Sequence, residues 1–225
     1  ITVDFTSNFR ANTIGIRPPT PTMQQYASVW LDGTDEDGTT ANYWGWRNRE
    51  TLVRMQRGEE GIYTTQFWGD IYLGNSPRFD EMYGTSLSNQ QNLSVSGGSE
   101  KSRFRLSFGY AENVGNLITS YDGKEQFNLR FNHDYQISDR IKLETGISYF
   151  RTNISSPSGG LDLTSISNDP PFFPSTNPFG QWYANFGVAG NRNSVASTVD
   201  GGRDESIADQ LKLYMAATVD ITEDL

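Results

Sequence analysis

The chain has 225 residues, 13% of them aromatic, and a formal net charge of -9. This abundance of Phe, Tyr and Trp excludes a disordered segment. The negative charge disfavours nucleic acid and anionic membrane surfaces as partners, because phosphate binding needs clustered Lys and Arg. Cysteine is absent, which excludes disulfides, thiolate nucleophiles and Cys-ligated metals. No run of about 18 apolar residues occurs, so no membrane-spanning helix is predicted.

Six segments alternate apolar and polar residues with period two, the pattern of a β-strand with one apolar face. In chain order they lie near residues 2–10, 91–95, 103–110, 126–137, 140–149 and 210–221. The fourth is the clearest, since Phe127, Leu129 and Phe131 alternate with Asn128 and Arg130. The first opens the chain with no basic or apolar leader before it. We expect any signal peptide to be removed or to lie outside this sequence.

The connections between these segments sort by length. Short turns at 97–102 and 138–139 join the second strand to the third and the fourth to the fifth, whereas long connections cover about 14–88 and 154–208. In an up-and-down sheet, short turns then lie at one rim and long loops at the other. This asymmetry is typical of outer-membrane barrels, which have periplasmic turns and long extracellular loops.

The sequence therefore predicts an all-β fold: about six antiparallel strands of a transmembrane β-barrel, with residues 1–225 belonging to that one domain. Six strands cannot close a membrane barrel, for which about eight is the minimum. Two open edges in lipid would leave backbone groups unpaired, so we expect a portion of a larger barrel. A soluble or surface-attached β-sandwich that binds carbohydrate is the alternative, because its strands alternate in the same way.

The middle of the chain resembles SusC/RagA-type transporters. In Asn89–Glu100 and Phe104–Tyr110, a strand ending in a Ser-Gly-Gly turn precedes one ending in Gly-Tyr, and Phe127–Asn132 with its return at Ile137–Leu143 is also similar. The resemblance covers roughly residues 85–155. It implies a 22-stranded, TonB-dependent barrel with a plug, in the outer membrane of a Gram-negative bacterium of the Bacteroidetes type. This sequence lacks the family's plug, TonB-binding segment and remaining strands.

The same resemblance implies the partners and the cargo. A SusD-like surface lipoprotein would cap the barrel, the TonB complex would act through the absent plug region, and outer-membrane lipid would surround the strands. The family imports oligosaccharides or oligopeptides. An outer-membrane barrel with a structural or secretion role would share the fold and differ by lacking the plug.

Both long connections are rich in aromatic residues, whose faces stack on sugars and peptide side chains. Long loops held by a rigid scaffold also concentrate binding residues. The candidates for contact with substrate or with the lipoprotein lid are Trp30, Trp44, Trp46, Trp68, Tyr72, Phe173, Trp182 and Tyr183. The alternative is that these rings only pack the loops together. Within the first connection, Asn48–Arg57 followed by Gly58 predicts a short capped helix.

The sequence carries no nucleophile, P-loop or dinucleotide motif, so we expect neither an enzyme nor a cofactor. The only histidine, His133, alternates in phase with the apolar residues of its strand, which suits an interfacial or lipid-facing ring and not a base. The run Asp32, Asp35 and Asp37 spaces oxygens that could bind Ca²⁺, but it lacks the distal bidentate glutamate of an EF-hand. We favour a solvated acidic turn, so no metal site is predicted.

Overall fold

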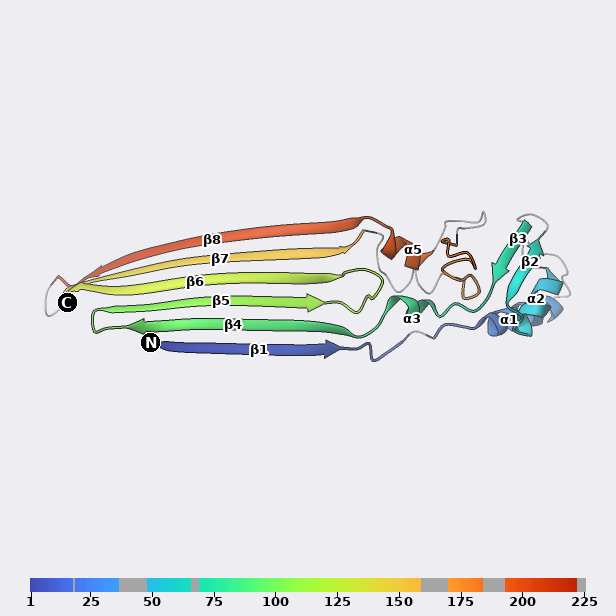
Figure 1. Ribbon diagram of the computed structural model, residues 1–225, viewed down its shortest axis with the longest axis horizontal. Helices are drawn as coiled ribbons and strands as arrows, with labels where there is room; N and C mark the ends of the chain where they lie inside the picture. Colours follow the sequence, from blue (N-terminus) through green and yellow to red (C-terminus); the bar gives the residue numbers. More distant parts are fainter. Residues whose placement is uncertain (18, 37–47, 66–68, 159–169, 184–192, 222–225) are drawn as a thin grey trace.

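A six-stranded antiparallel sheet forms one end of the molecule, and a smaller unit of helices and a hairpin forms the other (Figure 1). This computed structural model describes residues 1–17, 19–36, 48–65, 69–158, 170–183 and 193–221. The strands of the sheet are β1 Thr2–Asn12, β4 Ser86–Gly98, β5 Ser102–Val114, β6 Gly123–Ser138, β7 Ile141–Pro157 and β8 Arg203–Val219. They lie in the order β1-β4-β5-β6-β7-β8. The predicted set of six antiparallel strands is confirmed.

The short and long connections lie at opposite ends of the sheet, as predicted (Figure 1). The short turns are 99–101 and 139–140, and the longer connections are 13–85, 115–122 and 158–202. The strands extend further toward the long connections than expected. β4 has 13 residues where only 91–95 was predicted, and β8 begins at Arg203 and not near residue 210. Polar side chains occupy both faces of the sheet near this rim, so the hydrophobic alternation disappears there.

One face of the sheet is an apolar belt that crosses neighbouring strands in register. One row is Leu93, Phe108, Leu129, Tyr149 and Leu211, and the next is Val95, Leu106, Phe131, Ile147 and Leu213. Within the described part of the chain no second layer covers the belt, and Leu129 remains 44% exposed and Leu213 73% exposed. A β-sandwich would bury such a face against its second sheet. The β-sandwich alternative is therefore not supported, and the belt is complementary to an apolar environment outside the chain.

On β7 and β8 the apolar belt ends at Arg151 and Asp209, on the side of the long connections, whereas Phe127 of β6, opposite Arg151, still belongs to the belt. Arg151 Nε lies 3.7 Å from Asp209 Oδ1, and the hydroxyl of Tyr149 from the belt donates to Asp209 at 2.5 Å. From Phe127 to Tyr135, at about 3.3 Å per residue, the belt extends roughly 26 Å along β6. This length is close to the apolar band of about 25 Å on outer-membrane barrels.

The opposite face of the sheet is mostly polar, and its large apolar or aromatic side chains are Phe150, Ile154 and Tyr214. Its middle row is Asp4, Ser94, Ser107, Arg130, Ser148 and Lys212. Arg103 and Arg105 share this face on β5, and among the described residues neither they nor Arg130 lies in an ion pair. Such a face suits a wet or protein-filled lumen.

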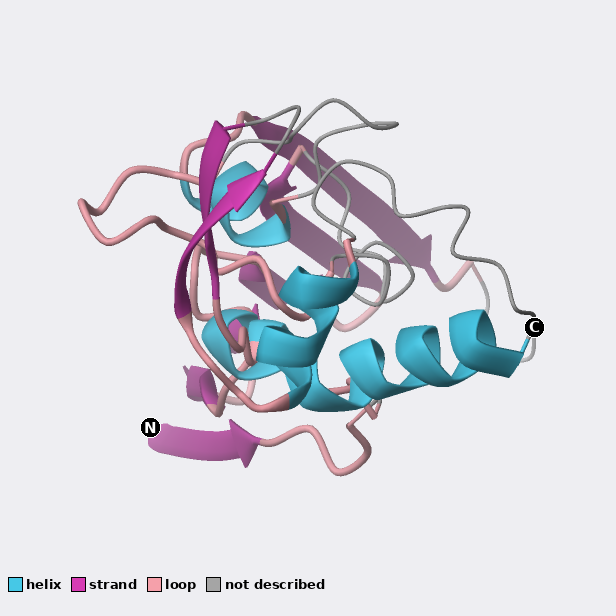
Figure 2. Ribbon diagram, turned by 90° about the vertical axis from the view of Figure 1, so that its right-hand side faces the viewer, coloured by secondary structure: helices cyan, strands magenta, loops and turns pink. Residues whose placement is uncertain are grey.

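The two long connections fold together into one unit, here called the head (Figure 2). Its elements are α1 Met23–Glu36, α2 Arg49–Gln56, the hairpin of β2 Gly61–Thr65 and β3 Gly69–Leu73, α3 Arg78–Met82 and α5 Ser194–Val199. The core of the head contains Met23, Ala27, Leu31, Leu52, Met55, Tyr63, Ile71, Leu73 and Phe172. All of these except Phe172 come from the first connection. No helix in the described ranges is both long and apolar enough to cross a membrane.

The predicted helix after Asn48 is confirmed as α2. The Asn48 side chain accepts a hydrogen bond from Thr51 N at 2.8 Å, which caps the helix, and Gly58 follows it with φ of 77°. This left-handed conformation favours glycine. The sequence analysis did not predict α1, the β2–β3 hairpin, α3 or α5.

Candidate functional site

The second long connection is fixed against the first by backbone hydrogen bonds. Gly74 N donates to Phe172 O at 3.0 Å, and Ser76 N donates to Pro171 O at 2.9 Å. The segment 170–183 therefore lies beside the end of β3 and the residues that follow it.

A buried arginine strengthens this junction. Arg78 is 3% exposed, its Nη2 donates to Phe173 O at 2.7 Å, and its Nη1 donates to the Ser175 hydroxyl. Glu81 lies 3.5 Å from the same guanidinium and accepts a hydrogen bond from Ser175. A buried charge needs such partners, because desolvation of an isolated ion is costly. Arg78 thus couples α3 of the first connection to the backbone of the second.

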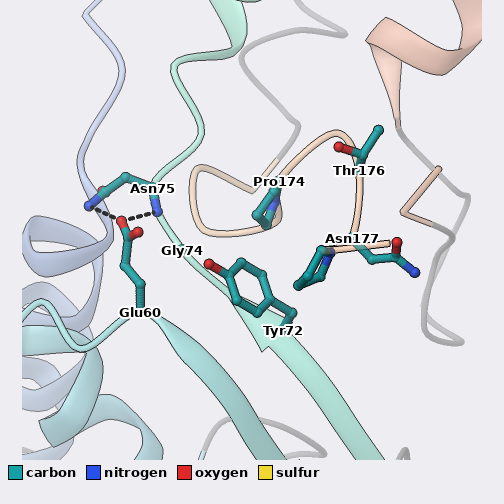
Figure 3. Close-up of a pocket in the computed structure, with 8 residues that line it drawn as sticks. Glu60, Tyr72, Gly74, Asn75, Pro174, Thr176 and Asn177 are labelled. Atoms are coloured by element: carbon teal, nitrogen blue, oxygen red, sulfur yellow. Dashed lines mark hydrogen bonds between the residues drawn. The ribbon is translucent and has the colours of Figure 1, made fainter. Parts of the chain in front are cut away.

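A pocket of about 280 Å³ opens at this junction (Figure 3). Its lining residues are Glu60, Tyr72, Gly74, Asn75, Pro174, Thr176, Asn177 and Pro178. The first four come from the β2–β3 hairpin and its flanks, and the others come from the second connection. The volume is at the low end for ligand sites, so the pocket suits a single side chain or a single sugar ring.

The carboxylate of Glu60 is held in one position at the edge of this pocket. Its Oε1 accepts hydrogen bonds from Asn75 N at 2.9 Å and from Asn75 Nδ2 at 3.2 Å, as Figure 3 shows. A Cβ atom on Gly74 would lie 3.4 Å from both Glu60 Cδ and Tyr72 Cε1. Because residue 74 is glycine, the space between the carboxylate and the aromatic ring stays open.

Tyr72 is held at its backbone by Tyr183. The Tyr183 hydroxyl donates to Tyr72 O at 2.5 Å, and burial raises the pKa of Tyr183 to about 12. The phenol is therefore protonated at any ordinary pH and remains a donor. Asn193 in turn donates to Tyr183 O at 3.2 Å and to Ser175 O at 2.7 Å, which fixes both ends of this part of the second connection.

The ion pairs of the described head do not include Glu60, the acid that lines the pocket. Arginines of the described head pair with acids in the combinations Arg17–Asp80, Arg49–Asp35, Arg54–Glu59, Arg57–Glu59 and Arg78–Glu81. No lysine occurs in residues 13–85 or 158–202. Among the described residues Glu60 has no basic partner, and it is the only charged residue that lines the pocket. Among the residues that the structure describes, no cation therefore compensates the negative charge of the pocket.

The structure separates the predicted loop aromatics into different environments. Tyr72 lines the pocket. Phe173 and Tyr183 stack on each other with ring centroids 5.5 Å apart and pack inside the head. Trp30 lies on α1 against the core, and Trp182 is 37% exposed with its Nε1 donating to Asp200. The structure thus brings Tyr72, Phe173 and Tyr183 together, while Trp44, Trp46 and Trp68 lie outside the described residues.

The acidic run of the first connection is not a turn where the structure describes it. Asp32 and Asp35 lie inside α1, and Asp35 forms an ion pair with Arg49. The turn expected over these residues is therefore wrong, because the helical spacing of Met23, Ala27 and Leu31 carries the helix through them. Asp37 lies outside the described residues. In the described ranges no group of three or more His, Asp or Glu side chains could hold a metal ion.

Sequence reasoning missed the polar residues of the pocket, namely Glu60, Asn75, Thr176 and Asn177. They are common surface residue types, and those of the two connections lie about one hundred positions apart in the sequence. Pro170, Pro171, Pro174 and Pro178 stiffen the second connection, but they do not indicate which segment it packs against.

The fold is similar to that of solved transport proteins. The RagAB peptide transporter matches 98% of this chain with a TM-score of 0.67 and 12% sequence identity. The RagAB peptide importer matches the same share at 14% identity, with a TM-score of 0.64 in its closed-closed state and 0.65 in its open-open state. The chain spans 26% of the length of each of these proteins. No family model matches the sequence, and no curated protein does.

At these identities the similarity shows the fold alone. The chain has the fold of a section of a β-barrel transporter, with six antiparallel strands and two long connections, which confirms the predicted fold class. These three structures are described as a peptide transporter or a peptide importer.

Proposed function

We propose that this chain forms part of the barrel wall and the extracellular head of a SusC-like, TonB-dependent outer-membrane importer of oligopeptides or oligosaccharides. The observation that carries the proposal is the uncovered apolar belt on one face of the sheet, opposite a mostly polar face. A membrane β-barrel is the structure that needs both faces, because lipid contacts one and the lumen contacts the other. The similarity to RagAB supports a role in transport.

In this proposal the sheet and the head have different tasks. The polar face borders the lumen, where a plug domain from outside this chain contacts it. The head projects from the long-loop rim, binds cargo there and is covered by a SusD-like lipoprotein. TonB acts through the plug, and none of these steps requires a cofactor or a catalytic residue from this chain.

Two arginine substitutions on β6 of the full-length protein test the membrane assignment. Leu129→Arg places a charge in the apolar belt, and we expect a cost of about 2–4 kcal/mol at the bilayer midplane. Gln126→Arg is the matched control, because Gln126 shares the polar face with its neighbours Ala111 and Thr152. The measurement is the amount of folded, heat-modifiable protein in washed outer membranes.

We expect Leu129→Arg to reduce this amount strongly and Gln126→Arg to leave it near the wild-type value. Equal recovery of the two variants, or recovery of the wild-type protein in the salt-washed soluble fraction, would contradict the proposal.

A further inference from the structure

The pocket at the junction of the two long connections offers a ligand mostly hydrogen-bond acceptors. Glu60 Oε1 is occupied by Asn75, whereas Glu60 Oε2 has no hydrogen-bond partner among the described residues. Tyr72 and Thr176 also line the pocket, and a hydroxyl group can accept as well as donate a hydrogen bond.

The amide groups of the pocket are already committed to the protein. Asn75 Nδ2 donates to Glu60. Asn177 Oδ1 accepts from Phe179 N and Gln181 N, each at 3.0 Å, while Asn177 Nδ2 donates to Gln181 Oε1 at 2.9 Å. Both amide oxygens are occupied, since Asn75 Oδ1 accepts from Met23 N at 2.8 Å, and each amide nitrogen keeps one further N–H. The charged acceptor Glu60 Oε2 therefore distinguishes this lining, and it favours a ligand group that donates to a carboxylate.

The charge of the pocket points to the same kind of ligand. Glu60 is the only charged lining residue and lacks a basic partner within the described chain. The ring of Tyr72 lies across the gap that Gly74 leaves open, as Figure 3 shows. A cation in this gap would meet the carboxylate of Glu60 on one side and the hydroxyl end of Tyr72 on the other, and oxygen atoms of both can accept hydrogen bonds from a charged donor. An anionic group would be repelled.

We propose that this pocket is a subsite for one cationic side chain of an oligopeptide, a lysine ammonium or an arginine guanidinium, with Glu60 as its counter-ion and Tyr72 as its opposite wall. The inference rests on the proposed import function and specifies its cargo. The volume of about 280 Å³ accommodates one side chain and not a whole peptide. Pro174 and Pro178 stiffen one wall, so little ordering is needed on binding.

Three proteins test the subsite: the full-length wild type, Glu60→Gln and Asp70→Asn. Gln retains the oxygen that accepts from Asn75, so Glu60→Gln removes the charge and keeps the local fold. Asp70→Asn is the matched control, because Asp70 is an acid of the same hairpin that does not line the pocket. The probes are two blocked pentapeptides that are identical except for one central residue, which is lysine in one and norleucine in the other.

Binding is measured by calorimetry in detergent. We expect wild type and Asp70→Asn to prefer the lysine peptide by roughly fivefold, the upper end for an exposed ion pair. Glu60→Gln should abolish this preference and leave the affinity for the norleucine peptide unchanged. Gly74→Ala should weaken the binding of both peptides, because it narrows the gap without changing the charge of the pocket.

The subsite is overturned if the wild type binds the two peptides equally or binds neither. It is also overturned if Asp70→Asn loses the preference for the lysine peptide as much as Glu60→Gln does. Loss of binding to a neutral trisaccharide in Glu60→Gln, with peptide binding unaffected, would assign the pocket to a sugar instead. The importer proposal is tested separately, by the recovery of wild type and Gln126→Arg in outer membranes and the loss of Leu129→Arg. If that experiment gives the expected result, a failure of the subsite is not a failure of the importer proposal.

Discussion

Phe172 of the second long connection packs against Tyr26 of α1, with ring centroids 4.7 Å apart and an interplanar angle of 55°. The Phe172 side chain is fully buried in a core otherwise built from the first connection. Two segments that sequence alone describes as separate loops therefore share one core. The pocket exists because this contact holds them together.

Truncation of Phe172 should separate the two connections. Phe172→Ala removes a fully buried ring, and such changes cost about 3–5 kcal/mol. We expect faster protease cleavage within 170–183 and faster amide exchange in the β2–β3 hairpin of the full-length protein, while the heat-modifiable mobility of the barrel is unchanged. Phe179→Ala is the control, since Phe179 is 87% exposed. Equal rates of protease cleavage and amide exchange in the two variants would show that the shared core contributes little to the stability of the head.

The buried guanidinium of Arg78 should matter more than an exposed one. Arg78→Met leaves Phe173 O and Ser175 without their charged donor, and hydrogen bonds to charged groups contribute about 1.5–3 kcal/mol each. Arg17→Met breaks a surface pair with Asp80, which contributes at most about 1 kcal/mol. Denaturant unfolding of the head, followed by tryptophan fluorescence, should give Arg78→Met a clearly lower free energy of unfolding than Arg17→Met. The reverse order would argue against the coupling role of Arg78.

Tyr183 should make the head sensitive to alkali. Burial raises its pKa from 10.0 to about 12, so between these values the unfolded head has lost a proton that the native head retains. The stabilisation is fully present below about pH 10 and is lost as pH rises toward 12, by roughly 2–3 kcal/mol in total. Tyr183→Phe should be somewhat less stable at about pH 8, because Tyr72 O loses its donor.

The readout for Tyr183 is the slope of stability against pH and not its absolute value. Unfolding of wild type and Tyr183→Phe is compared at about pH 9 and about pH 11. We expect a smaller loss for Tyr183→Phe across this interval, since other buried tyrosines such as Tyr63 contribute equally to both proteins. Identical slopes would mean that Tyr183 titrates normally in the native head.

The strands of the six-stranded sheet could be predicted from the sequence, because the pattern of apolar and polar residues that identifies them is local. Leu129 and Phe131 lie on one face of the sheet and Arg130 lies on the other, so the period-two pattern is the direct result of strand geometry. The strand ends at the long-loop rim were not predicted, because the alternation of apolar and polar residues is absent there. Glu112 and Glu125 pair across β5 and β6 above the apolar belt, where neither face is apolar and no alternation remains.

Only part of the structure of the head could be predicted from the sequence. Met23, Ala27 and Leu31 recur at helical spacing, so α1 was predictable in principle, but the aspartates that follow suggested a turn. The pocket was not predictable at all. Its Glu60 and Thr176 are brought together by Phe172 and Arg78, and no local pattern encodes contacts between segments so far apart.

The orientation of the sheet can be tested by single cysteines, since this sequence contains none. Ile62 lies on β2 of the head and is 62% exposed, whereas Glu100 lies in the turn between β4 and β5 at the opposite rim. In the full-length protein on a cysteine-free background, Ile62→Cys should react with a membrane-impermeant maleimide on intact cells. Glu100→Cys should react only after the outer membrane is permeabilised, because barrel turns of this length face the periplasm. Labelling of Glu100→Cys on intact cells, with Ile62→Cys protected, would require the head to lie in the periplasm and would remove it from any role in cargo capture.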